Sequence, residues 1–269
     1  MIPKIIHYCW FGRNPKHKLE KKCIASWKKF CPDYQIIEWN EDNYDLASAP
    51  LFVRQAIEAK KWAFATDYIR LKVVYEYGGI YMDTDVELIK PLDSLLDNKL
   101  YFGLQHSNSF ISVATGLGFG AEKHTEFLRE LMAVYESEPF LLPNSEKNIT
   151  PNTAKEKTVF QKYGLMLEDR EQFLMDVIHI YSSEYFNPIH WGEKKPNLTE
   201  KTISIHWYSA SWWDNANIRR ILGSGKAYRI AMFILHIPNR IMLTILGREA
   251  YESMKKVLKL GMGRLRGKS

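Results

Sequence analysis

Short apolar runs alternate with helical periodicities along the first forty residues of the chain. Residues 4–10 form a continuous apolar and aromatic run that stops at Phe11-Gly12, as a buried strand of a mostly parallel sheet does. Apolar side chains then recur at helical spacing over residues 16–30, and Pro32 ends that helix. Residues 35–39 supply a second strand. Strand, helix and strand in this order predict an α/β fold with a doubly wound, mostly parallel, Rossmann-like sheet.

Two further helices precede an acidic triplet. We expect one helix from about Pro50 and another over residues 62–77, which Gly78-Gly79 ends. Residues 80–82 then form a strand that leads directly into Asp83-Thr84-Asp85, and residues 86–89 stay extended. The triplet therefore lies at the carboxyl end of a strand, where ligands bind in open α/β sheets.

The second half of the chain is less regular. Residues 99–120 alternate apolar with small or polar positions, and three glycines there indicate a bend or a close backbone approach: Gly116, Gly118 and Gly120. Residues 122–135 predict a helix, and the polar, proline-bearing stretch 139–158 predicts a mobile loop beside the site. Residues 202–206 form a late strand that feeds an aromatic stretch.

Length and composition indicate one catalytic domain. The chain has 269 residues, of which 46% are hydrophobic and 25% charged, so disorder is not the default interpretation. The three cysteines form no CxxC pair and suit a reducing compartment. The first residues enter a strand without a secretory leader pattern. We therefore expect a cytoplasmic protein.

Positive charge is concentrated near the C-terminus. Residues 214–269 contain 12 basic and three acidic residues, a net charge of +9 against +6 for the whole chain. We divide the chain into a catalytic domain, 1–225, and a basic amphipathic helical tail, 226–269. Docking of this tail on an anionic membrane surface, at the inner face of the cell membrane, is the preferred interpretation. A helical hairpin packed on the catalytic domain is the alternative, and nucleic acid is not an expected partner.

The two carboxylates of the triplet predict a metal site. On an extended backbone Asp83 and Asp85 point to the same face, with side chains about 6 to 7 Å apart, close enough to hold one divalent ion and the diphosphate that it bridges. The pattern alone is weak. The catalytic motif of haloacid-dehalogenase phosphatases also begins with D-x-D. Its fifth position is Thr or Val, whereas this chain has Glu87 there.

Several blocks, in family order over residues 2–213, resemble glycosyltransferase family 32, which includes capsule and O-antigen sugar transferases, Och-type mannosyltransferases and relatives of glucosylating clostridial toxins. They are IPKIIHYCWFG at 2–12, SWKKFCPDY at 26–34, EWN at 38–40, WAFATDYIR at 62–70, YGGIYMDTD at 77–85, YFNP at 185–188 and HWYSASW at 206–212. The resemblance implies a GT-A fold, a nucleotide-sugar donor, Mn²⁺ or Mg²⁺, and retention of anomeric configuration.

The resemblance also implies roles for individual residues. Asp83 and Asp85 match the metal-binding DXD motif, and Asp67 and Arg70 match the pair that holds the donor sugar. At i and i+3 of a helix, these two side chains can also pair with each other. Trp10 matches the ring that stacks on the base, and His206 completes the metal shell. Further donor contacts are expected from Tyr8, Asn40, Thr84, Ser211 and Trp212.

The predicted activity is transfer of a hexose from a nucleoside-diphosphate sugar to a glycan or lipid-linked glycan acceptor in capsule, O-antigen or polysaccharide synthesis. UDP-galactose is the first donor expected, followed by UDP-glucose, UDP-N-acetylhexosamines and GDP-mannose. Two alternatives stay open: a donor-binding but inactive glycan-binding protein, and a haloacid-dehalogenase-like phosphatase.

Overall fold

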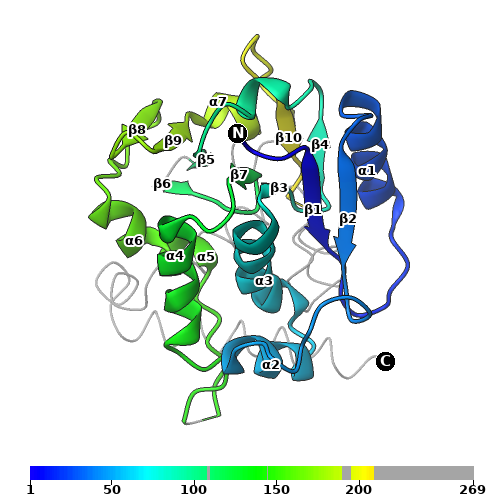
Figure 1. Ribbon diagram of the computed structural model, residues 1–269, viewed down its shortest axis with the longest axis vertical. Coiled ribbons are helices and arrows are strands. Elements are labelled where there is room, and N and C mark those ends of the chain that lie inside the picture. The colour runs from blue at the N-terminus through cyan, green and yellow to red at the C-terminus, as the bar shows by residue number, and fades with distance from the viewer. Residues whose placement is uncertain (108–109, 144, 190–194, 209–269) are drawn as a thin grey trace, which may run out of the picture. The chain divides into compact units, whose positions relative to one another are not determined.

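The computed structural model describes residues 1–107, 110–143, 145–189 and 195–208 (Figure 1). The expectations for Ser211, Trp212 and the segment 226–269 lie outside this range. No helix within the described ranges is long and apolar enough to cross a membrane.

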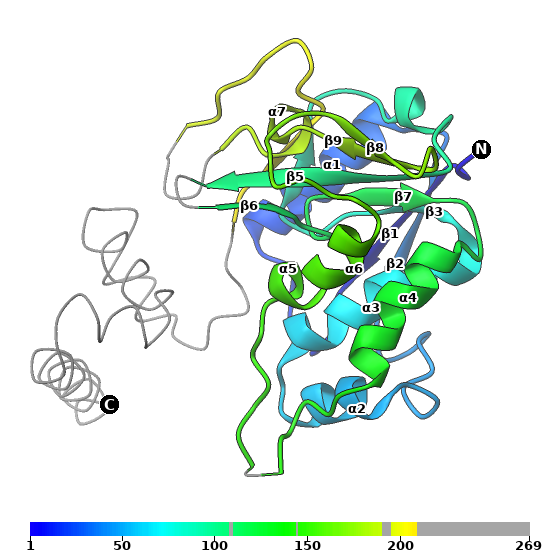
Figure 2. The ribbon, with the colours of Figure 1, turned by 90° about the vertical axis from the view of Figure 1, so that its left-hand side faces the viewer.

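A mixed sheet of eight strands forms the centre of the fold (Figures 1 and 2). Its order is β2-β1-β3-β7-β5-β9-β8, and β6 pairs with β5. Strands β1, β2, β3, β5 and β9 run in the same direction, whereas β7 is antiparallel to both of its neighbours. The predicted mostly parallel sheet is thus confirmed, with β6, β7 and β8 as its antiparallel strands. The bounds are β1 Ile5–Cys9, β2 Gln35–Trp39, β3 Gly79–Tyr81, β5 Leu100–Ser107, β6 Phe110–Val113, β7 Phe119–Ala121, β8 Gln172–Leu174 and β9 Ile178–Tyr181.

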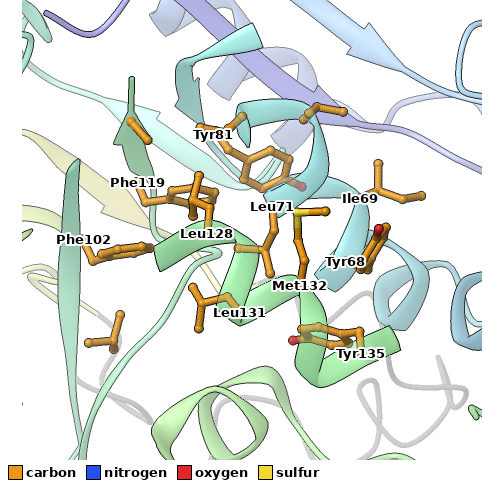
Figure 3. Packing of buried hydrophobic residues seen from close by; sticks show 14 of the residues in the cluster. Tyr68, Ile69, Leu71, Tyr81, Phe102, Phe119, Leu128, Leu131, Met132 and Tyr135 are labelled. Carbon is orange, nitrogen blue, oxygen red and sulfur yellow. The ribbon is translucent and has the colours of Figure 1, made fainter. Parts of the chain in front are cut away.

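Helices cover both faces of this sheet. On one face α2 (Leu51–Glu58), α3 (Trp62–Tyr77) and α4 (Glu126–Glu136) pack on a cluster that includes Tyr81 and Phe119 (Figure 3). On the other face α1 (Lys18–Phe30) contributes Trp27 to a second cluster, which contains Ile80. Adjacent strand residues point to opposite faces, so Ile80 and Tyr81 serve different cores. The predicted α/β class is therefore confirmed.

Helix α3 has the predicted bounds and lies deep in the fold. Ten of its residues are buried, from Phe64 to Val74, so it is covered on nearly all sides. Tyr77 is 47% exposed because it lies in the last turn. Gly78 and Gly79 end the helix at φ 65° and 101°, and a Cβ on Gly79 would lie 2.8 Å from the Ile5 carbonyl oxygen. Only glycine fits this close approach without strain.

His7 supports the sheet from inside the core. The side chain is fully buried. Its Nε2 donates to the Gly78 carbonyl oxygen at 2.8 Å, while Nδ1 accepts the indole N–H of Trp39 at 3.0 Å. Burial lowers the pKa of His7 to about 4, so the imidazole is neutral at physiological pH.

The prediction for residues 139–158 is wrong in part. Phe140 and Glu156 are buried, and two short helices, α5 (Asn152–Lys155) and α6 (Lys157–Lys162), form where a mobile loop was expected. Polar sequence was a poor guide here because the polar side chains of this stretch find partners inside the fold. The helix expected over 122–135 begins only at Glu126, after His124 adopts φ 57°.

A second, two-stranded sheet lies beside the acidic triplet. Strand β4 (Val86–Leu88) pairs antiparallel with β10 (Ser204–His206), and His206 lies opposite Val86. The backbone N–H of Trp207 continues the ladder by donating to the Asp85 carbonyl oxygen at 3.0 Å. The remaining short elements are η1 (Asp93–Leu95) and α7 (Ser183–Phe186). This ladder brings the end of the described chain next to Asp85.

Candidate active site

The acidic triplet is a tight turn at the carboxyl end of β3. The backbone N–H of Met82 still pairs with the His7 carbonyl oxygen, at 3.1 Å. The Asp83 carbonyl oxygen then accepts the N–H of Val86 at 3.0 Å, which closes a four-residue turn. The predicted location at a strand end is confirmed, but the extended backbone expected between Asp83 and Asp85 is wrong. The turn brings the two carboxylates together instead.

Asp83, Asp85 and His206 form a cluster with the composition of a metal site. One ligand atom from each residue lies within 4.8 Å of the other two. His206 Nε2 is 3.1 Å from Asp85 Oδ1, and His206 Nδ1 is buried without a hydrogen-bond partner in the part of the chain that the structure describes. Two carboxylates and an imidazole offer the oxygen and nitrogen ligands that Mn²⁺ accepts. The cluster therefore fits a divalent cation.

The charges in this cluster are incompletely balanced. Asp83 keeps 29% of its side chain exposed, and Asp85 is buried. Burial raises the pKa of Asp83, Asp85 raises it further, and Arg70 opposes both. Burial lowers the pKa of His206, but Asp85 outweighs that effect, so the pKa lies above its ordinary value. A proton and a metal cation would compete for the same negative charge here.

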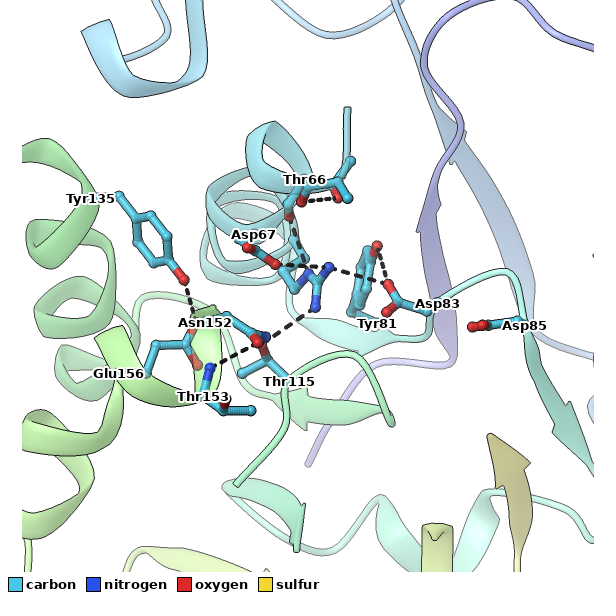
Figure 4. Close-up of polar contacts among 12 residues, drawn as sticks. Thr66, Asp67, Tyr81, Asp83, Asp85, Thr115, Tyr135, Asn152, Thr153 and Glu156 are labelled. Atoms are coloured by element: carbon cyan, nitrogen blue, oxygen red, sulfur yellow. Dashed lines mark hydrogen bonds and ion pairs between the residues drawn. The ribbon is translucent and has the colours of Figure 1, made fainter. Parts of the chain in front are cut away.

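Asp67 and Arg70, on α3, form the predicted i, i+3 pair. Arg70 Nη2 lies 3.1 Å from Asp67 Oδ1 and 3.3 Å from Asp83 Oδ1 (Figure 4). Both residues are buried, so the pair is not a salt bridge on a helix surface. Burial raises the pKa of Asp67 to about 7, with Arg70 acting in the opposite direction. Arg70 thus connects Asp67 to the acidic turn.

Three residues that the sequence did not single out for chemistry hold this arrangement. The Tyr81 hydroxyl donates to Asp83 Oδ1 at 3.0 Å, and Thr115, fully buried, lies 3.5 Å from Arg70 Nη1. The Gly116 carbonyl oxygen accepts the N–H of Asp83 at 3.2 Å. A Cβ on Gly116 would lie 2.3 Å from Asp83 Oδ2, which confirms the close approach expected at this glycine. Thr115 had no local sequence signal.

Of the other predicted donor contacts, Trp10, Tyr8 and Asn40 have hydrogen-bond partners outside the acidic cluster, and Thr84 lies within the turn. Trp10 is partly buried, and its indole N–H donates to the Asn14 carbonyl oxygen at 2.7 Å. Tyr8 is buried, and its hydroxyl donates to Glu38. Asn40 stabilises its own turn by accepting the N–H of Asp42 at 2.8 Å. Thr84 is partly exposed within the acidic turn.

Part of this chain is similar to known glycosyltransferases. Residues 17–102 match the family model described as "Glycosyltransferase sugar-binding region containing DXD motif". Inositol phosphoceramide mannosyltransferase 3 of Schizosaccharomyces pombe is 33% identical over 101 residues, which cover 35% of this chain and 27% of that protein. Mannosyl phosphorylinositol ceramide synthase of Saccharomyces cerevisiae is 27% identical over 140 residues, covering 50% and 35%. The match thus spans about a quarter to a third of each relative's length.

Two solved glycosyltransferase structures are similar to parts of this chain at low sequence identity. The PaToxG glycosyltransferase superposes with a TM-score of 0.46 at 22% identity, covering 60% of this chain and 70% of that one. The galactosyltransferase LgtC, solved with donor and acceptor sugar analogs, gives a TM-score of 0.42 at 12% identity, covering 87% and 97%.

The matched residues 17–102 include α3 with Asp67 and Arg70 and the turn with Asp83 and Asp85. Residues 17–102 of this chain are therefore similar to the sugar-binding region of glycosyltransferases that contain a DXD motif.

Proposed function

We propose that this glycosyltransferase moves a hexose from a nucleoside-diphosphate sugar to a hydroxyl group of a glycan or lipid-linked glycan, in the synthesis of a capsule, O-antigen or related polysaccharide. One observation carries the proposal. Asp83, Asp85 and His206 place three ligand atoms within 4.8 Å of one another, and Arg70 links this cluster to the buried carboxylate of Asp67. A cation site next to a paired carboxylate and guanidinium suits a diphosphate joined to a sugar.

Asp83, Asp85 and His206 would hold Mn²⁺ or Mg²⁺. The imidazole favours Mn²⁺, because Mg²⁺ takes almost only oxygen ligands. When bound, the cation supplies positive charge that stabilises the departing nucleoside diphosphate. The protein holds the two carboxylates in the turn that the Asp83 carbonyl oxygen closes with Val86, so the site is organised before the donor arrives.

The buried pair on α3 would orient the donor sugar. Asp67 accepts hydrogen bonds from sugar hydroxyl groups, and Arg70 donates to them. Because Arg70 contacts both Asp67 and Asp83, a sugar held by the pair lies close to the diphosphate end of the site. This orientation brings the anomeric carbon to the acceptor and lowers the entropic part of the barrier.

We propose that the reaction retains configuration through attack on the same face as the departing phosphate. Each carboxylate of the site already has a partner: Asp67 with Arg70, Asp83 with Arg70 and Tyr81, and Asp85 with His206. A carboxylate held in this way is a poor candidate for a covalent nucleophile. The leaving phosphate oxygen then takes the proton of the acceptor hydroxyl.

The donor base and sugar are open to direct test. Trp10, at the end of β1, is our candidate for stacking on the base, with Tyr8, Asn40 and Thr84 as further donor contacts, together with Ser211 and Trp212. UDP-galactose is the donor that the sequence favours. The named mannosyltransferase relatives add weight to GDP-mannose, so both donors belong in the same panel.

The experiment is a donor panel with purified protein. Release of nucleoside diphosphate from UDP-galactose, UDP-glucose, UDP-N-acetylglucosamine and GDP-mannose is measured with Mn²⁺ and with chelator, alongside Asp85→Asn. We expect Mn²⁺-dependent release from one donor and loss of that release in the variant. An inactive glycan-binding protein releases nothing from any donor, and a phosphatase instead hydrolyses p-nitrophenyl phosphate. Either result overturns the proposal.

The membrane role of residues 226–269 is a separate proposal, supported by their basic composition and by the lipid-linked acceptor that we propose. Such a protein would act at the inner face of the cell membrane. Co-sedimentation with anionic liposomes should be strong for the full chain and weak for a chain cut after Gly225. Equal binding by both chains contradicts a role for the tail.

A further inference from the structure

A fully buried carboxyl group lies behind Arg70 and has no part in the chemistry described so far. Glu156, between α5 and α6, is 1% exposed. The Tyr135 hydroxyl donates to its Oε1 at 2.7 Å (Figure 4). Its Oε2 is buried and has no hydrogen-bond partner among the described residues. Burying an ionised carboxylate with one oxygen unpaired is costly, so this group needs an explanation.

Thr115 lies between Glu156 and Arg70. Its Oγ1 accepts the side-chain N–H of Asn152 at 2.9 Å and faces Arg70 Nη1 at 3.5 Å. A threonine hydroxyl has two lone pairs and one proton. When both lone pairs accept hydrogen bonds from these donors, the hydroxyl proton of Thr115 can be donated to the carboxyl group of Glu156. The pKa of Glu156 responds to this hydrogen bond. Glu156 can therefore orient the hydroxyl that faces Arg70.

Arg70 carries one positive charge and already contacts two carboxylates, those of Asp67 and Asp83. Its guanidinium already lies within 3.3 Å of Asp83 and 3.1 Å of Asp67. Lys155, the residue before Glu156, is bound to Glu138 at 2.8 Å. An ionised Glu156 would therefore compete with Asp67 and Asp83 for the same guanidinium.

The environment of Glu156 favours its protonated form. Burial raises the pKa of Glu156 to about 8, and Asp67 on α3 adds to this effect. Tyr135 on α4, Arg70 on α3 and Thr115 before β7 act in the opposite direction. The carboxyl group is consequently neutral at pH 7, and its charge appears only in alkaline solution.

We propose that Glu156 is a positioning residue of this glycosyltransferase: a buried neutral carboxylic acid that orients Thr115 and leaves the Arg70 guanidinium committed to Asp67 and Asp83. The inference rests on the proposed function, because Arg70 and Asp67 are its donor-binding pair. Ionisation of Glu156 draws Arg70 away from that pair. Donor binding weakens, so KM for the donor rises more than kcat falls.

The first experiment is a pH profile of kcat/KM for the donor in wild type, Glu156→Gln and Glu156→Ala. With a pKa of about 8, roughly nine tenths of Glu156 is ionised at pH 9, and wild-type kcat/KM falls about tenfold there. Glu156→Ala lowers kcat/KM at pH 7 through KM. Glu156→Gln keeps the shape of the neutral acid, recovers that loss and removes the alkaline decline. A Glu156→Gln profile that declines like wild type overturns the proposal, as does a folded Glu156→Gln protein that is inactive at pH 7.

Tyr135→Phe is a second variant with an opposite signature. The Tyr135 hydroxyl lowers the pKa of Glu156, so its removal should shift the alkaline decline to higher pH. An unchanged or acid-shifted decline contradicts the proposal.

Infrared difference spectroscopy supplies a measurement that needs no turnover. Wild type minus Glu156→Gln should show the carbonyl band of a protonated acid at pH 7 that disappears by about pH 10. Absence of the band at pH 7 means that Glu156 is ionised and the inference is wrong. This measurement does not depend on activity. If the wild type is inactive in the donor panel, the proposed function is therefore wrong, but the protonation state of Glu156 is still tested.

Discussion

Replacing Gly116 by alanine tests how tightly the fold holds the first carboxylate of the acidic turn. An alanine Cβ at this position would lie 2.3 Å from Asp83 Oδ2 and 3.2 Å from Arg70 Nη1. Carbon and oxygen atoms normally approach no closer than about 3.3 Å, so the carboxylate must move by about 1 Å. Its other oxygen is held by Tyr81 at 3.0 Å and Arg70 at 3.3 Å, so movement breaks at least one of these contacts.

The size of the effect follows from those contacts. A hydrogen bond to a charged group contributes about 1.5–3 kcal/mol, which corresponds to roughly ten- to a hundredfold in binding. Misplacing a catalytic group by about 1 Å costs about a hundredfold in rate. We therefore expect Gly116→Ala to lower kcat/KM about a hundredfold. The backbone at Gly116 lies outside the left-handed region, so alanine adds no backbone strain and the fold should persist.

The assay is Mn²⁺-dependent donor turnover, measured with the melting temperature of each protein. Gly164→Ala is the matched control. It places alanine at φ 96°, where the backbone is strained, but the new Cβ has nothing within 4 Å. This control should lose some stability and keep its activity. Wild-type kcat/KM in a folded Gly116→Ala protein would refute the description of the turn.

Four further predictions concern the site. Asp85→Asn should lower kcat by at least about a hundredfold without changing the circular dichroism spectrum, whereas a near-normal rate rules out its metal role. His206→Ala should weaken Mn²⁺ affinity about tenfold or more in a Mn²⁺ titration, and unchanged affinity excludes the imidazole as a ligand. The pKa of Asp67 is raised to about 7, so its ionised fraction grows with pH, and kcat/KM should rise between about pH 6 and pH 8. The same raised pKa makes this carboxyl group reduce stability as the pH rises from about 4 towards 7, so the melting temperature of Asp67→Asn should exceed that of wild type at pH 8.

The sequence pattern within α3 predicted both the helix and the side-chain pair that it contributes to the site. Helix α3 has the expected bounds because Gly78 and Gly79 adopt positive φ angles that few other residues tolerate. The i, i+3 spacing of Asp67 and Arg70 is a property of the helix itself, so their pairing followed as well. Predictions that depend on neighbours in sequence succeeded here.

Predictions that depend on tertiary contacts did less well. The turn at Asp83 replaces the expected extended backbone because Gly116 and Val86 bind its main chain, and neither contact is visible in the triplet itself. Segment 139–158 appeared polar and loop-like, yet Glu156 is buried against Tyr135, 21 residues away. Thr115 has no local signal, because its importance comes from Arg70 and Asn152, which lie far from it in sequence.

The pairing of His206 with the acidic turn came from family resemblance and not from spacing. The β4–β10 ladder places it opposite Val86, and no periodicity along the chain indicates that register. A residue 121 positions from Asp85 reaches its carboxylate at 3.1 Å only because two short strands pair.

The central claim is that Asp83, Asp85 and His206 bind a divalent cation together with a nucleoside diphosphate. Titration of the full chain with Mn²⁺ in the presence of UDP or GDP, followed by the electron paramagnetic resonance signal of free Mn²⁺, tests it without turnover. We predict one tightly bound Mn²⁺ per chain in wild type and loss of that binding in Asp85→Asn. Equal binding by the two proteins, or no binding by wild type with either nucleotide, would contradict the account.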